Sequence, residues 1–135
     1  MRNDKWTHLS PNQLNKVDGI EWIRLHYAYP SKFPMEIIDA IKNCEHVCNY
    51  LDMPLQHASD NMLKAMNRQI TRAETTQLIQ DIRTQIPDIG LRTTMLVGFP
   101  GETEQDIEEL IAFIKNYLCY VFMFACLFVC FSSMI

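Results

Sequence analysis

Segments with a strand-like pattern alternate with segments with a helix-like pattern along residues 20–116, and this order limits the folds open to the chain. Strands are predicted at 21–28, 50–55 and 90–97; the first alternates side chains with a period of two, and the third is mostly apolar. One helical segment follows the first strand, two follow the second and one follows the third. The succession predicts an α/β fold, with about three parallel strands and covering helices.

Capping residues and apolar spacing predict where the four helices begin and which faces they bury. Pro34 suits the first turn of the first helix, and Ser59 is a candidate cap for the second. Thr71 and Glu74 have capping-box spacing at the start of the third, which Pro87 ends. Thr103 opens the fourth, with acidic residues in its first turn. The second helix is expected to run through Asp60, Leu63 and Met66. The apolar positions expected on the buried faces of the other three are Ile37, Ile38, Ile41, Leu78, Ile79, Ile82, Ile86, Ile107, Leu110, Ile111 and Ile114.

Three strands are too few to close an α/β barrel, and an open piece of this size leaves strand edges exposed. The chain is therefore expected to be part of a larger barrel domain. It divides into a polar lead-in at residues 1–19, a partial α/β core at 20–116 and a hydrophobic tail at 117–135.

Charge is distributed unevenly along the chain. Every Lys, Arg, Asp and Glu lies at or before Lys115, and the net charge of −4 carries no electrostatic signature of nucleic-acid binding. Tyr117–Phe131 is an uninterrupted apolar run, somewhat short for a spanning helix, which needs about 20 residues. Two interpretations of the tail remain: a membrane-associated segment, or translation out of frame. We favour the second, because the change of composition at about Asn116 interrupts the expected barrel domain.

The cysteines do not form a recognisable framework. There are five, at positions 44, 48, 119, 126 and 130, and the N-terminus has no signal-peptide pattern. Reduced thiols in a cytoplasmic protein are expected. Neither Cys44-x3-Cys48 nor Cys126-x3-Cys130 continues as C-x3-C-x2-C, so no metal ligand is assigned, and no catalytic residue is assigned either.

Polar or glycine-rich segments follow each predicted strand, where functional residues of α/β proteins gather. These corners are 26–30, 56–59 and 98–103. The glycines of the third corner permit close backbone approach to a ligand, although a structural turn explains them equally well. His57 in the second corner is expected to be a hydrogen-bonded loop residue rather than a metal ligand.

Two arginines lie inside predicted strands. Arg24 and Arg92 are expected to be largely buried and therefore to need a partner, either a structural ion pair or a bound anionic ligand. The sequence leaves both interpretations open.

Three stretches together resemble a known family: WIRLHYAYPSKFP, YLDMPLQHASDNMLKAMNR and LRTTMLVGFPGETEQDIEEL. In this order and at these separations they resemble the radical-SAM core of the methylthiotransferases, over about residues 18–116. The combination of G-x-P-G-[EQ]-T with P-[LV]-Q-x-x-S-D-x-x-L-K-x-M-x-R is specific to few radical-SAM enzymes. His57 and the segment 27–30 resemble the RimO branch; the tRNA-modifying, MiaB-like branch tends to carry Gln-Ser-Gly-Ser at the second corner.

The resemblance implies a part of a radical-SAM (βα) barrel and a specific chemistry. Family members use a [4Fe–4S] cluster to cleave S-adenosylmethionine to a 5′-deoxyadenosyl radical, and a second cluster serves in sulfur insertion. RimO-like enzymes modify the β-carbon of an aspartyl residue in a small-subunit ribosomal protein. By resemblance, the residues around the S-adenosylmethionine pocket are Arg24, Gln56, Ser59, Arg92, Gly98, Pro100, Gly101 and Glu102.

The chain departs from the family pattern in three respects. The radical-SAM cysteine motif, the N-terminal domain with further cluster cysteines and the C-terminal TRAM domain are absent from the sequence. We therefore expect a fragment of a ribosomal-protein methylthiotransferase that is inactive alone. The alternatives are a fragment of a tRNA methylthiotransferase and a non-catalytic, membrane-tethered fragment.

Overall fold

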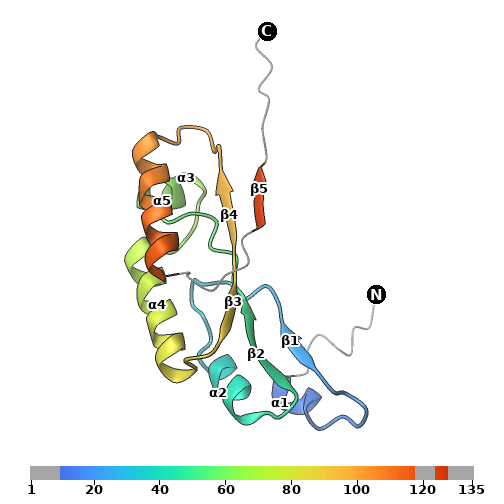
Figure 1. Ribbon diagram of the computed structural model, residues 1–135. Coiled ribbons are helices and arrows are strands. Elements are labelled where there is room, and N and C mark those ends of the chain that lie inside the picture. Colours follow the sequence, from blue (N-terminus) through green and yellow to red (C-terminus); the bar gives the residue numbers. More distant parts are fainter. Residues whose placement is uncertain (1–9, 118–123, 128–135) are drawn as a thin grey trace.

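The computed structural model describes residues 10–117 and the backbone of 124–127. Helices and strands alternate along the chain as the sequence predicts, and Figure 1 shows them in order. The elements are α1 (Pro11–Leu14), β1 (Ile23–Leu25), α2 (Glu36–Asn43), β2 (Val47–Asp52), α3 (Asp60–Ala65), α4 (Arg72–Gln85), β3 (Gly90–Arg92), β4 (Thr94–Val97), α5 (Glu104–Tyr117) and β5 (Phe124–Leu127).

The predicted α/β class is confirmed: β1, β2 and β3 form a parallel sheet in that order, and the sheet does not close into a barrel. Leu51 of β2 is in register with Leu25 on one side and with Leu91 on the other. β4 pairs in parallel with β5. An isolated parallel bridge between Gln56 and Met95 places the segment after β2 beside β4.

The strand predicted at 90–97 is divided at Thr93 into β3 and β4, and the neighbouring chain explains the break. Pro54 has no backbone N–H and cannot donate to a ladder. The N–H of Leu55 then donates to the side-chain Oγ1 of Thr93, at 3.2 Å, rather than to a backbone carbonyl. Backbone pairing resumes at Gln56, whose N–H donates to the carbonyl of Thr94 at 2.9 Å.

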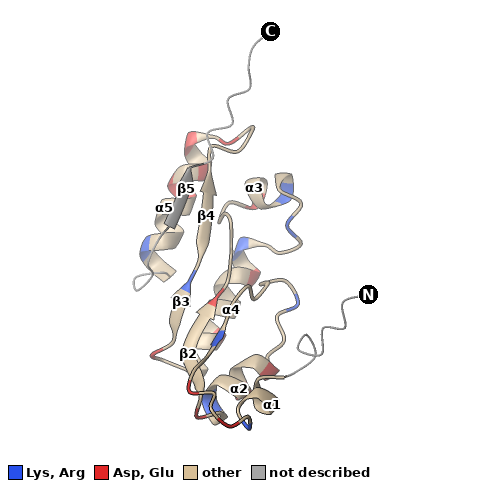
Figure 2. Ribbon diagram, turned by 90° about the vertical axis from the view of Figure 1, so that its right-hand side faces the viewer, with Lys and Arg blue, Asp and Glu red and all other residues tan. Residues whose placement is uncertain are grey.

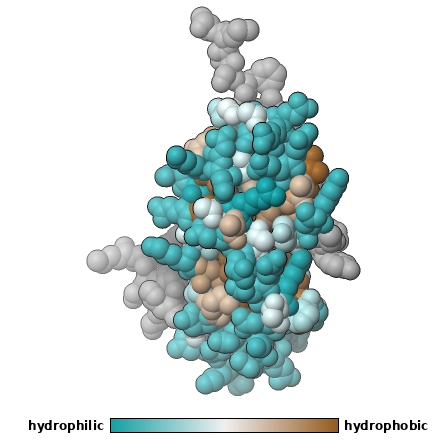
Figure 3. Space-filling model, turned by 90° about the vertical axis from the view of Figure 1, so that its left-hand side faces the viewer, coloured by the Kyte–Doolittle hydropathy of each residue, from teal (hydrophilic) through white to brown (hydrophobic). Residues whose placement is uncertain are grey.

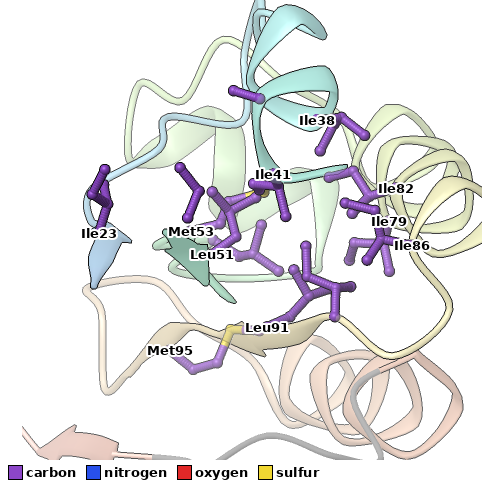
Figure 4. Packing of buried hydrophobic residues seen from close by; sticks show 14 of the residues in the cluster. Ile23, Ile38, Ile41, Leu51, Met53, Ile79, Ile82, Ile86, Leu91 and Met95 are labelled. Carbon is purple, nitrogen blue, oxygen red and sulfur yellow. The ribbon is translucent and has the colours of Figure 1, made fainter. Parts of the chain in front are cut away.

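The core lies between the sheet and the helices α2, α4 and α5. α4 and α5 run along one side of the strands in Figure 1, and isoleucines of α2 and α4 meet Leu51 and Leu91 of the sheet in Figure 4. Phe113 of α5 is fully buried. The outer surface of the helices is mostly hydrophilic, with smaller hydrophobic areas (Figure 3). This one-sided packing leaves the opposite face of the sheet uncovered by helices.

The predicted helix faces are confirmed in part; among the predicted helix starts, the cap of α4 is confirmed, whereas Pro34 lies before α2, whose N-cap is Met35. Ile79, Ile82 and Ile86 are buried as expected, and the capping box of Thr71 and Glu74 is formed. The expected stripe of α5 is wrong at Ile111, which is 45% exposed. Leu110 is buried as expected, and the unpredicted Asp106 and Phe113 complete the buried side of α5, because the helix turns a polar residue toward the loop after β2.

The segment predicted as a polar lead-in includes the short helix α1, and the predicted tail includes β5. β5 pairs along its whole length with β4, from Thr94↔Phe124 to Val97↔Leu127. The rest of the tail beyond Tyr117, like residues 1–9, lies outside the described residues. Within the described ranges, no helix has the length and apolar character needed to cross a membrane.

Candidate functional site at the carboxyl edge of the sheet

Two of the corners predicted from the sequence come together at the carboxyl edge of the strands. The loop after β2, residues 56–59, lies beside the turn after β4, residues 98–103, because Gln56 pairs with Met95. The helices α3 and α5 both start here (Figure 1). The parallel strands thus place two loops of distant sequence side by side, as α/β folds do at their functional edge.

His57 and Glu102 join the two corners. The imidazole Nε2 of His57 lies 3.1 Å from Oε1 of Glu102, and the His57 side chain is fully buried. The backbone N–H of Ser59 donates to Nδ1 of His57 at 2.9 Å, so the ring proton is on Nε2 and is donated to the carboxylate. The other carboxylate oxygen, Oε2, accepts from the backbone N–H of Gly98 at 2.7 Å. Glu102 therefore binds the start of its own turn through one carboxylate oxygen and the loop after β2 through the other. The prediction of His57 as a hydrogen-bonded loop residue is confirmed.

Asp106 makes a second connection between the same loops. Its carboxylate accepts from the hydroxyl of Ser59, from the backbone N–H of Thr103 at 2.9 Å and from the Thr103 hydroxyl at 2.6 Å. The Ser59 hydroxyl first, and then the Thr103 hydroxyl and N–H, hold the pKa of Asp106 well below its usual range. Ser59 is thus placed before α3 as expected, but its hydroxyl binds Asp106 instead of capping that helix.

The backbone of this edge adopts conformations that most side chains avoid. Gly98 and Gly101 have φ of 81° and 85°, and Gln56 has φ of 72°. Gly101 has no atom within 4 Å of the position of an added Cβ, so its backbone faces open space. Gly98 and Pro100 beside it are exposed. The turn therefore presents an accessible backbone surface next to the end of β4.

Arg92 and Arg24 lie further along the strands, and the structure separates their roles. Nη1 of Arg92 lies 3.0 Å from Oδ2 of the buried Asp52, so one of the two predicted outcomes, the ion pair, is realised at Arg92. The expectation that both arginines are largely buried is wrong: 39% of the Arg92 side chain is exposed, and Arg24 is exposed because β1 turns it to the face of the sheet opposite the core. Its guanidinium lies 4.3 Å from the centroid of the Tyr50 ring.

Sequence reasoning did not assign Asp52 or Asp106. Asp106 occupies the third position of α5, where it reads as an ordinary acidic residue of a first helical turn. Asp52 lies at the end of a strand, and only the register with Arg92 reveals its partner. The spacing of Thr103 and Asp106 is the one local signal for a capping interaction, and it is realised in both directions.

The cysteines of the described region do not fit a metal cluster at this edge. Cys44 and Cys48 lie before and at the start of β2, at the amino end of the strands, and the thiol of Cys44 contacts Asn12 Oδ1 at 2.9 Å. The described residues contain no group of three or more metal-ligating side chains. The turn after β4, by contrast, leaves the backbone of Gly101 accessible to a small ligand with hydrogen-bonding groups.

Comparison with known proteins identifies the family to which this edge belongs. The model of the radical SAM superfamily matches residues 7–114, which include all the corners described above. The chain belongs to the radical SAM superfamily.

Within this superfamily, the chain is similar to RimO-type enzymes. A protein of Porphyromonas gingivalis strain ATCC 33277, named ribosomal protein uS12 methylthiotransferase RimO, is 53% identical over 104 residues, 77% of this chain and 24% of that protein. Proteins of the same name from Flavobacterium johnsoniae and Bacteroides thetaiotaomicron are 53% and 50% identical over 103 and 104 residues, 76% and 77% of this chain and 24% of each relative. This chain spans about a quarter of the length of these curated relatives. The predicted resemblance to RimO-like methylthiotransferases is confirmed.

Proposed function

We propose that this chain forms the central part of a radical-SAM enzyme that methylthiolates the β-carbon of an aspartyl residue in the small-subunit ribosomal protein uS12. The observation that carries the proposal is the similarity to RimO-type enzymes, 53% identity over 104 residues, across the segment that builds the carboxyl edge. This edge brings the loop after β2 and the turn after β4 together.

In the proposed enzyme the carboxyl edge borders S-adenosylmethionine, which supplies the radical and the methyl group when bound. The exposed backbone of Gly101 and the carbonyls of Gly98 and Pro100, together with the Gln56 side chain, would hold the polar parts of the cofactor, since the Gly98 N–H is already donated to Glu102. Ser59 and Glu102 are proposed to act indirectly, since their side chains are hydrogen-bonded within the protein and hold the two loops in place. Arg24 and Arg92 lie on β1 and β3, the strands on either side of β2.

The relatives' substrate favours a ribosomal protein over tRNA, and one structural contact is consistent with this choice. The position after Gln56 is His57, whose ring donates to Glu102. A serine there, as in the tRNA-modifying branch, is too short to span the same contact.

A hybrid enzyme tests the function. Residues 18–116 of this chain replace the matching segment of the Porphyromonas gingivalis enzyme, and the methylthiolation of uS12 is measured by mass spectrometry of its peptides. We expect modified uS12 and no modified tRNA. An inactive hybrid that carries its clusters and is as well folded as the parent enzyme would count against the proposal, and modified tRNA would favour the other branch.

The 135-residue polypeptide by itself is proposed to be inactive, because its sequence holds no C-x3-C-x2-C motif. Anaerobic reconstitution with iron and sulfide is expected to give no redox-active [4Fe–4S] spectrum. A stoichiometric cluster signal on this polypeptide would contradict this part of the proposal.

A further inference from the structure

The face of the sheet that α4 and α5 leave uncovered carries polar and charged side chains from three strands. Leu25, Leu51 and Leu91 belong to the core, and side chains alternate along each strand. Arg24 and Arg92 are therefore directed to the other face. Figure 2 turns this side of the molecule toward the viewer, and both basic and acidic positions occur on the strands there.

The side chains on this face form one continuous row. The guanidinium carbon of Arg24 lies 4.3 Å from the centroid of the Tyr50 ring, and the His26 ring lies 5.6 Å from it. His26 Nδ1 lies 3.6 Å from Oδ2 of Asp52, which also binds Arg92 at 3.0 Å. Each contact joins one strand, or the residue that follows it, to the next, so the row crosses β1, β2 and β3.

The charges along the row do not balance. Asp52 is buried, with 7% of its side chain exposed, and its carboxylate is engaged by Arg92 and His26. No carboxylate in the part of the chain that the structure describes lies within ion-pair distance of Arg24. The row thus carries two guanidinium groups against one carboxylate, and the extra positive charge is on the exposed Arg24.

The contact with Tyr50 places the Arg24 guanidinium carbon over the aromatic ring. A cation over an aromatic ring is attracted to the ring and loses little of its hydrogen-bonding capacity, because the N–H groups point outward in the guanidinium plane. That planar fork matches a carboxylate, with two parallel hydrogen bonds. Arg24 therefore has the geometry and the charge of a carboxylate receptor.

We propose that Arg24, held over Tyr50, binds a carboxylate on the uncovered face of the sheet, and that this is the side-chain carboxylate of the aspartyl substrate. The identity of the ligand rests on the proposed function. The reacting β-carbon of an aspartyl residue is bonded directly to its carboxyl carbon, so a bidentate grip on the carboxylate fixes the position of the β-carbon. S-adenosylmethionine also carries a carboxylate, and it is the second source of the same chemistry.

Arginine-detected NMR of the 135-residue chain tests the site without any catalytic turnover. The probes are N-acetyl-aspartic acid N-methylamide, the matching asparagine amide, S-adenosylmethionine and its decarboxylated form. We expect the aspartic acid amide to shift the Arg24 guanidinium signals saturably and the asparagine amide to leave them unchanged. For the variants, binding is followed by backbone amide shifts: Arg24→Gln should weaken it at least about tenfold, since it removes both charge-assisted hydrogen bonds, and Arg24→Lys should retain part of it.

Arg72→Gln is the matched control, because Arg72 pairs with Glu109 on the helix side of the molecule. This variant should bind the aspartic acid amide like the unmodified chain. Arg24 is exposed, so Arg24→Gln is expected to keep the backbone spectrum of the folded chain.

Other outcomes decide against the proposal in distinct ways. Equal shifts from the aspartic acid and asparagine amides, or no shift of Arg24 from any carboxylate probe, would overturn the carboxylate site. A response to S-adenosylmethionine that its decarboxylated form lacks, without a response to the aspartic acid amide, would keep the site and overturn the aspartyl assignment. The hybrid enzyme's uS12 product is measured separately, so failure of the proposed function is distinguishable from failure of this site.

Discussion

His57 and Glu102 are joined by a buried hydrogen bond of 3.1 Å that connects the loop after β2 to the turn after β4. The two residues lie 45 positions apart in the sequence, so the contact forms only when the two loops meet in the folded chain. Because Glu102 also accepts from the N–H of Gly98, the shape of the exposed turn depends on a histidine in another loop.

Replacement of His57 by alanine tests this dependence. The change removes the donor to Glu102, leaves the Ser59 N–H without its acceptor and opens a cavity, so we expect a loss of about 3 kcal/mol in the free energy of unfolding. Urea unfolding followed by circular dichroism measures it. His46→Ala, at a half-buried position before β2, should cost less than about 1 kcal/mol. Equal losses would show that His57 has no special role.

The carboxylate of Asp106 should make stability depend on pH. Hydrogen bonds from Ser59 and Thr103 lower its pKa in the folded state, so its stabilisation is complete above the unfolded pKa of about 3.9 and is lost as pH falls below that value toward the folded pKa. In unfolding experiments from pH 7 to pH 3, the stability advantage of the unmodified chain over Asp106→Asn should shrink at the acid end. Ser59→Ala, which removes the first of these donors, should show a weaker pH dependence. Parallel curves for all three would contradict the assignment.

A side chain at Gly101 should destabilise the fold, although there is space for one. Its φ of 85° is unfavourable for alanine, so Gly101→Ala is expected to reduce the free energy of unfolding by about 1–2 kcal/mol. Gly90→Ala is the matched control: an added Cβ there lies 3.5 Å from the Asn49 carbonyl oxygen, an ordinary contact, and the change should be within about 1 kcal/mol. Thermal unfolding of both variants gives the comparison, and a larger loss at Gly90 would refute it.

The cap of α4 gives a local test of stability. The hydroxyl of Thr71 accepts from the N–H of Glu74 at 3.2 Å, so Thr71→Ala should cost about 1 kcal/mol. Thr84→Ala lies inside the same helix at an exposed position and should be close to neutral, because alanine is the better helix former. The free energies of unfolding in urea decide the matter; a Thr84 variant as unstable as the Thr71 variant would contradict the cap's contribution.

Features that depend on neighbours in the chain were predictable from the sequence. The Thr71 capping box and the stripe of Ile79, Ile82 and Ile86 need only residues three or four positions apart. The three strand regions follow from local composition and periodicity, although β2 (Val47–Asp52) lies three residues before the predicted 50–55, and their order is sufficient for a parallel α/β sheet. The motifs of the three corners also led to the radical SAM family that the comparison confirms.

Features that depend on which distant segments meet were decided only by the tertiary structure. Ser59 binds Asp106, 47 residues away, in place of its own helix, because α5 turns that carboxylate toward the loop after β2. Arg24 is exposed and Arg92 is paired because the helices cover one face of the sheet and leave the other open. The sequence determines which groups can form hydrogen bonds and how apolar residues are spaced. The partner of each polar group depends on packing between elements far apart along the chain.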